Sequence, residues 1–392
     1  MGTEIHRQML IFLRDRQDEM TGLLQRLIEL ESPTNHKPSL DRLGAYLADQ
    51  ARELGAQVEV LPQTEAGDHV LARWGGGDGG MLLLCHMDTV WNLGTVVQRP
   101  VRIEGGRLYG AGAMDMKGGI VVALEALGVL RAFDRWPECP ITLLLTSDEE
   151  TGSATSRPTI EAQARQHQVV FVLEPAQPPH GSLKTSRKGV GEYRLVVRGR
   201  AAHAGADHAQ GINAAEELAH QILTIQGFTD YAVGTTFNVG VVGGGTRRNV
   251  VPAEAWAEID VRIAQVEEAA RVATRMESLA PHLPGVELEV TGGVERPPMV
   301  RTPQIAALYA QAESLARGMG LEISEAGTGG ASDGNLTAAL GVPTLDGMGA
   351  VGEGGHSVDE YALLASLPER AALLAAMLRS TVPGRLSIRG SD

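Results

Sequence analysis

Three short apolar segments, separated by longer stretches with helical spacing, constrain the fold of this chain more than any other feature. They are Met81–Leu84, Ile141–Leu145 and Val169–Leu173. Uninterrupted apolar runs of this length are typical of strands buried on both faces, and an apolar helix is expected at 120–130, between the first two. This alternation predicts an α/β fold with a mostly parallel sheet covered by helices.

The pattern changes in the middle of the chain. Tyr193–Val197 and Ala255–Ile263 alternate between apolar and polar residues, as half-buried antiparallel strands do. Helical spacing resumes beyond residue 300. We therefore expect a discontinuous α/β domain, residues 1–185 and 297–392, interrupted by a smaller α+β domain at residues 186–296.

Charge and composition exclude several classes of function. The 392 residues carry a net charge of -14, which argues against non-specific nucleic-acid binding because that requires a basic surface. Two cysteines are too few for a disulfide framework, and the first residues lack the long apolar stretch of a signal peptide or membrane span. A cytoplasmic protein without nucleic-acid or membrane partners is the default expectation.

Side chains that bind metals follow each of the three predicted strands. His86 and Asp88 follow the first strand, Glu149 and Glu150 the second, and Glu174 the third. The carboxyl ends of parallel strands meet at one edge of a sheet, where ligands bind. These five side chains are therefore expected at a common rim.

Two glycine-rich segments add an acid and an imidazole, Asp115 within 110–119 and His356 within 352–357. The resulting set of nitrogen and oxygen donors suits zinc, or cobalt or manganese in its place, better than calcium or an iron–sulfur cluster. The first segment lacks the spacing of a phosphate-binding loop. Taken singly, Glu149 with Glu150 could be a solvated pair and His356 a surface residue; their combination predicts a metal centre.

Seven motifs in this sequence resemble the aminoacylase/glutamate carboxypeptidase family of two-zinc metallopeptidases, which includes acetylornithine deacetylases and succinyl-diaminopimelate desuccinylases. The motifs are closest to those of the bacterial glutamate carboxypeptidases. They are CHMDTV (85–90), GAGAMDMKGG (110–119), TSDEETGS (146–153), LEP (173–175), RAAHAGA (200–206), GGGTRRNVVP (243–252) and GHS (355–357). The resemblance implies a parallel-sheet catalytic domain that holds two divalent metal ions, Zn²⁺ before Co²⁺ or Mn²⁺, and an inserted ferredoxin-like lid and dimerisation domain.

The resemblance also implies a role for each residue of the predicted rim. It implies five metal ligands: Asp115 as the bridge, His86 and Glu174 on one ion, and Glu150 and His356 on the other. Glu149 would be the general base that takes a proton from a water activated by the two ions, giving a hydroxide-like nucleophile. Asp88 would be the partner behind a metal-bound imidazole.

His203 lies within the expected insertion, in the segment Arg200–Gly205. By its own sequence it could be a surface residue at the end of a strand. The resemblance implies that it donates a hydrogen bond to an oxyanion in the partner subunit, which predicts a homodimer.

Four residues are candidates for substrate binding. Arg296, Arg262 and Asn249 could hold a substrate carboxylate, the arginines because guanidinium binds it bidentately, although each could equally be a surface or strand-edge residue. Arg296 resembles the arginine that binds the terminal carboxylate in the bacterial glutamate carboxypeptidases. Ser332, in the segment 329–335, resembles their substrate loop, with a helix-capping turn as the alternative.

The leading hypothesis is a hydrolase that cleaves a peptide or N-acyl amide bond next to a free carboxylate. The substrate would be a small peptide or N-acyl amino acid, with C-terminal glutamate favoured. A dipeptidase or a biosynthetic deacylase for acetylornithine or succinyl-diaminopimelate is the second hypothesis. A metal- or peptide-binding protein without catalytic activity is the third.

Overall fold

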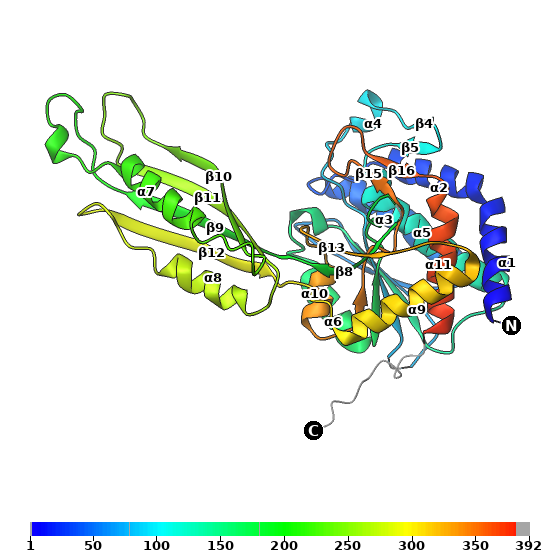
Figure 1. Ribbon diagram of the computed structural model, residues 1–392. Helices are drawn as coiled ribbons and strands as arrows, with labels where there is room; N and C mark the ends of the chain where they lie inside the picture. The colour runs from blue at the N-terminus through cyan, green and yellow to red at the C-terminus, as the bar shows by residue number, and fades with distance from the viewer. Residues whose placement is uncertain (1, 78, 180, 382–392) are drawn as a thin grey trace, which may run out of the picture. The chain divides into compact units, whose positions relative to one another are not determined.

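The computed structural model describes residues 2–77, 79–179 and 181–381, which form two compact units (Figure 1). The first unit contains the chain up to Thr185, Arg301–Gly327 and the chain from Ser332 onward; the second contains Ser186–Val300 and Thr328–Ala331. Compared with the predicted insertion at 186–296, the second unit extends to residue 300. The reason is a pair of main-chain hydrogen bonds, at 2.9 and 3.0 Å, between Arg187 and Met299.

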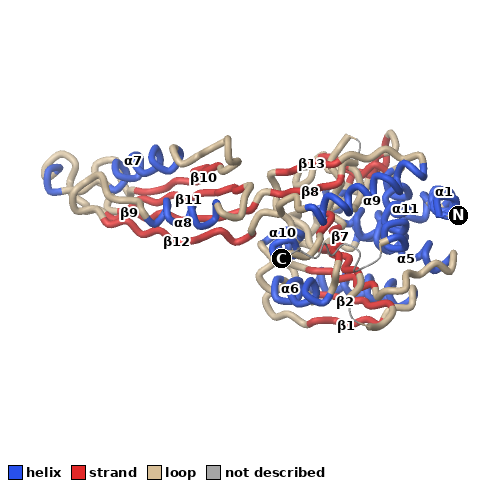
Figure 2. Tube along the Cα trace, turned by 60° about the horizontal axis from the view of Figure 1, so that its bottom comes forward, coloured by secondary structure: helices blue, strands red, loops and turns tan. Residues whose placement is uncertain are grey.

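A six-stranded sheet forms the centre of the first unit (Figure 2). Its spatial order is β1-β2-β6-β3-β7-β14. The three predicted strands lie side by side in parallel at its centre, and β1 and β2 add an antiparallel edge. The bounds are Gln57–Leu61 (β1), His69–Trp74 (β2), Met81–His86 (β3), Ile141–Thr146 (β6), Val169–Val172 (β7) and Thr344–Leu345 (β14).

Helices cover both faces of this sheet. Alternate residues of β3 pack into different cores. Leu83 and Cys85 lie in one core, and Leu82 and Leu84 lie in the other. His86 continues this alternation, on the side of the sheet opposite Cys85. One face packs against α1 (Gly2–Asp15), α2 (Gln17–Glu29), α3 (Lys37–Glu53), α5 (Gly118–Ala132), α9 (Pro303–Met319) and α11 (Ser366–Ser380). The other face packs against α6 (Arg157–Gln166) and α10 (Gly334–Ala339).

A small antiparallel sheet brings two distant segments of the first unit together. Its order is β15-β16-β5-β4, so the chain that leaves β5 lies near the loop between β15 and β16. The bounds are Arg102–Glu104 (β4), Arg107–Tyr109 (β5), Gly352–Glu353 (β15) and Tyr361–Leu363 (β16). Outside this sheet lie α4 (Thr95–Gln98) and the paired strands β8 (Leu183–Arg187) and β13 (Glu325–Thr328).

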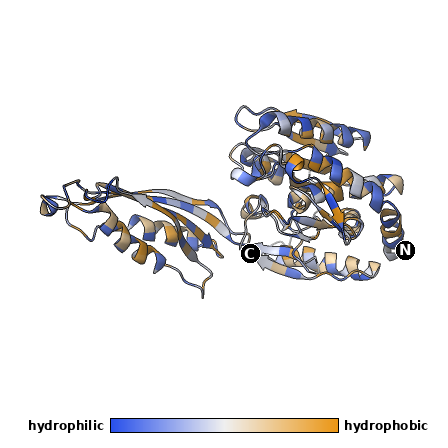
Figure 3. Cartoon of the chain, turned by 90° about the horizontal axis from the view of Figure 1, so that it is seen from above, coloured by the Kyte–Doolittle hydropathy of each residue, from blue (hydrophilic) through white to orange (hydrophobic). Residues whose placement is uncertain are grey.

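The second unit is an antiparallel sheet of order β10-β11-β9-β12 with α7 and α8 on one face (Figure 1). The chain order βαββαβ gives the ferredoxin-like fold expected for the insertion. Buried and more exposed residues alternate along its central strands, and apolar residues alternate with polar ones there (Figure 3). The bounds are Gly189–Arg198 (β9), Ala214–Gln226 (α7), Thr236–Gly244 (β10), Glu254–Ile263 (β11), Glu268–Glu277 (α8) and Glu287–Arg296 (β12).

In the described part of the chain, every helix is too short or too polar to cross a membrane.

Candidate metal centre

Asp115 lies between two histidines and the two predicted glutamate ligands. Its Oδ1 is 3.2 Å from Nε2 of His86, and its Oδ2 is 3.5 Å from Nε2 of His356. Glu174 Oε1 lies 3.4 Å from the same nitrogen of His86, and Glu150 Oε2 lies 3.1 Å from that of His356. The structure therefore brings all five predicted ligands together in two groups that share Asp115.

The spacing of these atoms fits donors around common metal ions. Two atoms bound to one tetrahedral zinc ion at about 2.0–2.1 Å are roughly 3.3 Å apart, close to the separations of 3.1 to 3.5 Å between the nitrogen and oxygen atoms here. Ligand atoms of His86, Asp115 and Glu150 all lie within 4.8 Å of one another. A set of imidazole and carboxylate donors suits zinc, cobalt or manganese.

The electrostatics of the cluster favour positive charge. Burial lowers the pKa of His86, but hydrogen bonds to its carboxylate neighbours, Asp115 foremost, raise that pKa well above the ordinary value. The pKa of His356 is raised to about 10, first by Asp115 and then by Glu150. Burial would raise the pKa of Asp115, yet both histidines together hold it below its usual range. Acids outnumber imidazoles, so protons or metal cations must neutralise the cluster.

The fold explains why these ligands meet. His86 ends β3, Glu150 lies in the turn after β6, and Glu174 follows β7, so three ligands lie at the carboxyl ends of parallel strands. Asp115 lies in the turn between β5 and α5, and His356 in the loop between β15 and β16. Because β5 and β16 are paired, the last two ligands come to the same place.

Asp88 is fully buried and contacts both sides of the cluster. Nδ1 of His86 lies 3.1 Å from the main-chain carbonyl of Asp88 and 3.4 Å from its Oδ1. The carboxylate accepts the main-chain N–H groups of Glu149 at 3.3 Å and Glu150 at 3.1 Å, and the hydroxyl of Thr34 at 2.8 Å. Asp88 therefore contacts the imidazole and fixes the turn that carries the half-buried Glu149, while its role behind a metal-bound imidazole stays a prediction. The contribution of Thr34 was not predicted.

Two of the predicted residues lie on adjacent loops of the second unit. His203 and Asn249 are both exposed, and the main-chain N–H of Ala204 donates to the carbonyl of Asn249 at 3.0 Å. Nδ1 of His203 accepts the main-chain N–H groups of Gly205 and Ala206 at 3.1 and 3.0 Å. A neutral imidazole that accepts at Nδ1 has its proton on Nε2. His203 therefore presents an N–H donor to solvent.

The two predicted arginines have different surroundings, both within the second unit. Arg262 donates through Nε and Nη2 to Asp260 at 2.9 and 2.8 Å, so its guanidinium is already paired with a carboxylate of the same chain. This pairing speaks against Arg262 as a substrate ligand. Arg296 is buried at the end of β12.

Ser332 is fully buried in the turn before α10. Its hydroxyl donates to Asp346 Oδ2 at 2.7 Å and accepts the N–H of Gly334, the first residue of α10, at 3.1 Å. These contacts give the side chain a structural role in the turn and speak against a direct contact with substrate.

Glu360 is a buried acid at this site that the sequence prediction missed. Burial raises its pKa to about 6, while hydrogen bonds from the main chain of Gly112 and Asp115 oppose that increase. It lies four residues after His356. Its local sequence resembles that of any loop acid, so only its long-range contacts reveal it.

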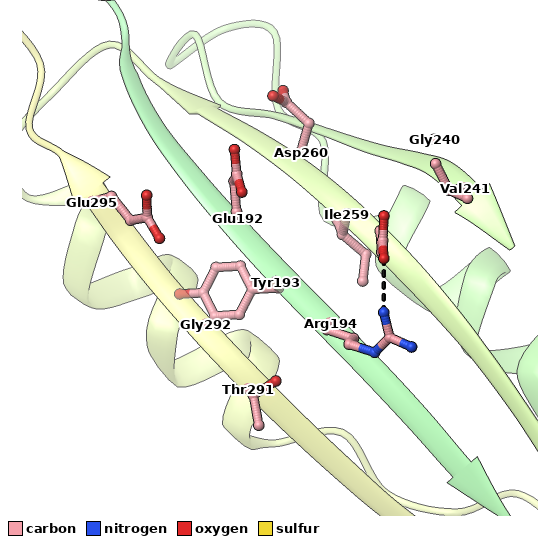
Figure 4. Close-up of a pocket in the computed structure, with 11 residues that line it drawn as sticks. Glu192, Tyr193, Arg194, Gly240, Val241, Ile259, Asp260, Thr291, Gly292 and Glu295 are labelled. Carbon is pink, nitrogen blue, oxygen red and sulfur yellow. Dashed lines mark hydrogen bonds and ion pairs between the residues drawn. The ribbon is translucent and has the colours of Figure 1, made fainter. Parts of the chain in front are cut away.

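A separate cavity of about 450 Å³ lies on one face of the sheet in the second unit (Figure 4). Glu192, Asp260 and Glu295 line it, beside an ion pair of 2.7 Å between Arg194 and Glu258. Its described lining contains neither imidazole nor thiol. Among the described residues, the group of three or more imidazole, thiol or carboxylate side chains close enough to hold one ion is His86, Asp115 and Glu150 of the first unit.

Comparison with known proteins agrees with this geometry. Residues 82–380 match the peptidase family M20/M25/M40. Carboxypeptidase G2 of Pseudomonas sp. (strain RS-16) is 29% identical over 378 residues, which cover 95% of this chain and 91% of that protein.

Solved structures share the fold at low sequence identity. The M20 family metallo-carboxypeptidase Sso-CP2 from Sulfolobus solfataricus has a TM-score of 0.74 at 17% identity, with 92% of this chain and 98% of that chain covered. The YXEP protein of Bacillus subtilis, a dinuclear metal binding peptidase, has a TM-score of 0.66 at 15% identity, with 93% and 98% covered. Because the family match spans most of the sequence, the chain belongs to the M20/M25/M40 family of peptidases, which makes it a hydrolase of the metallopeptidase class.

Proposed function

We propose that this chain is a two-metal hydrolase that cleaves a peptide or N-acyl amide bond next to a free carboxylate. The observation that carries the proposal is the position of Asp115, whose two oxygens face two histidines, each with its own glutamate. This arrangement is a symmetric site for two ions that share one carboxylate. The dinuclear site named for the YXEP protein supports it.

Glu149 is the residue we assign as general base. Its main-chain N–H is held by Asp88, and its neighbour Glu150 belongs to the ligand cluster. Metal ions held by the five ligands would polarise the substrate carbonyl and acidify a water when bound. Glu149 would take the proton of the attacking water and pass it to the departing nitrogen.

A C-terminal glutamate is the substrate group that we favour. The likeness to carboxypeptidase G2 supports a carboxypeptidase, and Arg296 is the arginine that we assign to the substrate carboxylate. Asn249, exposed beside His203, is a second polar group for this role.

We further propose a homodimer in which His203 acts on the partner subunit. Its Nε2–H is the donor that an oxyanion requires. A second copy would also cover apolar side chains around α7 and the edge strand β10, where Leu223, Tyr231 and Val242 are 74%, 85% and 56% exposed. Light scattering measures the assembly, and His203→Ala mixed with Glu149→Gln should regain activity through hybrid dimers. A strict monomer, or no recovery despite proven subunit exchange, contradicts this part.

The decisive experiment measures metal and substrate together. Metal content by mass spectrometry should give two divalent ions per chain, and hydrolysis should be screened over peptidyl- and acyl-glutamates, dipeptides, acetylornithine and succinyl-diaminopimelate. Fast turnover of the glutamates supports the proposal, whereas preference for dipeptides or the last two compounds makes the enzyme a dipeptidase or deacylase. Two bound ions without turnover of any amide would leave only a metal- or peptide-binding protein.

A further inference from the structure

The carboxylate of Glu360 accepts four N–H groups. Oε2 accepts from the indole of Trp91 at 3.0 Å and from the main chain of Gly112 at 2.9 Å. Oε1 accepts from the main chain of Met114 at 3.1 Å and of Asp115 at 3.2 Å. Three of the four donors thus belong to the turn that carries the shared metal-binding carboxylate.

This turn needs partners from elsewhere in the chain. Asp115 has φ -113° and ψ 95°, which is not helical, and Gly112 has a left-handed φ of 74°. Such main-chain N–H groups have no regular ladder to join, and leaving them buried without acceptors is costly. Glu360 is 1% exposed and supplies the acceptors.

The same residue connects the turn to the other components of the site. Glu360 lies four residues after His356, and its main-chain N–H donates to Ser357 at 3.1 Å, so one loop carries both the imidazole and this acid. Through Trp91 the carboxylate also contacts the segment that follows β3. A shift of Glu360 would therefore move the backbone of Asp115 relative to its partners.

We propose that Glu360 is a positioning residue of the metal centre. It holds the main chain of Asp115 in the position from which both carboxylate oxygens can bind a metal ion. The inference rests on the proposed two-metal function. Metal sites require their ligands to be held within about 0.5 Å of the productive geometry. Glu360 provides this by fixing the ligand's main chain, while the ligand's side chain stays free to bind.

Glutamine at this position tests the role because an amide has a single acceptor oxygen. Each oxygen of Glu360 receives two N–H donors. Whichever way the amide of Glu360→Gln is oriented, its NH₂ group opposes two donors. The variant keeps the shape of the side chain and removes half of its acceptors.

Glu217 offers a matched control in the other unit. It is fully buried and accepts the main-chain N–H groups of His282 and Leu283 at 2.7 to 3.0 Å, together with the amide of Gln221. Glu217→Gln should lower stability in the same way without contacting the metal ligands. It separates a general loss of stability from a loss of positioning.

The experiment titrates Zn²⁺ and Co²⁺ into metal-free protein against a chelator, with the absorption of bound Co²⁺ and the melting temperature as further measurements. Glu360→Gln should weaken metal binding by about 10–100-fold and alter the Co²⁺ spectrum, whereas Glu217→Gln should change neither. Trp91→Phe removes one of the four bonds and should weaken metal binding about fivefold.

The outcomes separate this inference from the proposed function. If the wild-type chain binds no pair of ions, the proposed function fails. If the wild type binds two ions and Glu360→Gln binds them equally well, or loses no more affinity than Glu217→Gln, the positioning role alone is overturned. If Glu360→Gln does not fold, Trp91→Phe decides, and unchanged metal affinity in that variant overturns the role.

Discussion

Asp88→Asn is the substitution for which the structure gives the sharpest expectation. Oδ2 of Asp88 receives the hydroxyl of Thr34 and the N–H of Glu150, and Oδ1 receives the N–H of Glu149 and faces Nδ1 of His86. Asparagine keeps one acceptor oxygen. In either orientation, its NH₂ group opposes one main-chain N–H of the turn that carries the two glutamates.

The magnitude follows from that count. A buried donor left without an acceptor costs about 1–3 kcal/mol, so the variant should lose roughly that much stability. The main-chain carbonyl of residue 88, 3.1 Å from Nδ1 of His86, remains in the variant, so the substitution removes only the contribution of the carboxylate at 3.4 Å from that nitrogen. Loss of such an outer partner weakens metal binding by about 10–100-fold.

The assay compares chelator-competition affinities for Zn²⁺, kcat at saturating metal and urea unfolding for Asp88→Asn and Thr34→Val. Thr34→Val removes the hydroxyl that contacts Asp88 at 2.8 Å and the carbonyl of Thr89 at 3.2 Å but keeps the carboxylate; it should cost about 1 kcal/mol of stability, with metal affinity changed less than about fivefold. Wild-type metal affinity in Asp88→Asn would refute the reasoning. Equal losses in the two variants would show that the hydroxyl, and not the carboxylate, orients the site.

Three further outcomes test other parts of the structure. Glu149→Gln should retain both metal ions while kcat falls by about 10²–10⁴-fold, whereas Glu150→Gln should lose metal, as mass spectrometry and kinetics can show; equal metal loss in both would contradict the assigned roles. His6 is buried, and burial together with a neighbouring arginine lowers its pKa to about 4, so its contribution to stability is complete above pH 6.5 and is lost as the pH falls toward 4. The free energy of unfolding, measured in urea at pH 7.5 and at pH 4.5, should fall between these pH values by up to about 3 kcal/mol less in His6→Gln than in the wild type. Equal decreases in the two proteins would contradict this contribution. Gly119→Ala would drive a Cβ into the main-chain carbonyl of Leu173, so urea unfolding should reveal a loss of about 1–3 kcal/mol of stability, and an equally stable variant would mean that α5 shifts easily.

The centre of the fold could be predicted because its strands are buried on both faces. Met81–Leu84, Ile141–Leu145 and Val169–Leu173 are apolar apart from Thr142, and such runs are typical of neighbouring strands in a parallel sheet covered on both faces. Strands β1 and β2 were not predicted. Glu59 in the edge strand β1 and Arg73 in the neighbouring β2 interrupt the apolar pattern, and an edge strand tolerates polar side chains.

The ligands followed from the same topology. His86, Glu150 and Glu174 each lie shortly after a predicted strand, so the position of the strand places them at the rim. The approach of Asp115 and His356 depends on the pairing of β5 with β16, a contact between segments more than 200 residues apart that local pattern does not encode. For these two, glycine-rich segments suggested candidates, and the resemblance of the motifs indicated their place in the site.

The contacts of Ser332 and Glu360 could not be predicted from the sequence, for a common physical reason. Each is a polar residue in a loop, and whether such a residue faces a ligand or the protein interior depends on which N–H groups lack acceptors nearby. The hydroxyl of Ser332 accepts the N–H of Gly334 and donates to Asp346, and the carboxylate of Glu360 accepts N–H groups of the turn before α5. The sequence identifies residues that can accept hydrogen bonds, but the tertiary fold decides which N–H groups lie beside them.

Asp88 and Glu360 together indicate how this chain would prepare the proposed metal site, whose carboxylates repel one another. Both are buried acids that accept main-chain N–H groups, the first from the turn of Glu149 and Glu150, the second from that of Asp115. Because they fix backbone, the ligand carboxylates are held close before any ion arrives, and the ion does not have to supply that ordering. The repulsion among those carboxylates then favours cation binding, because a cation reduces the repulsion and the fixed backbone prevents the carboxylates from moving apart.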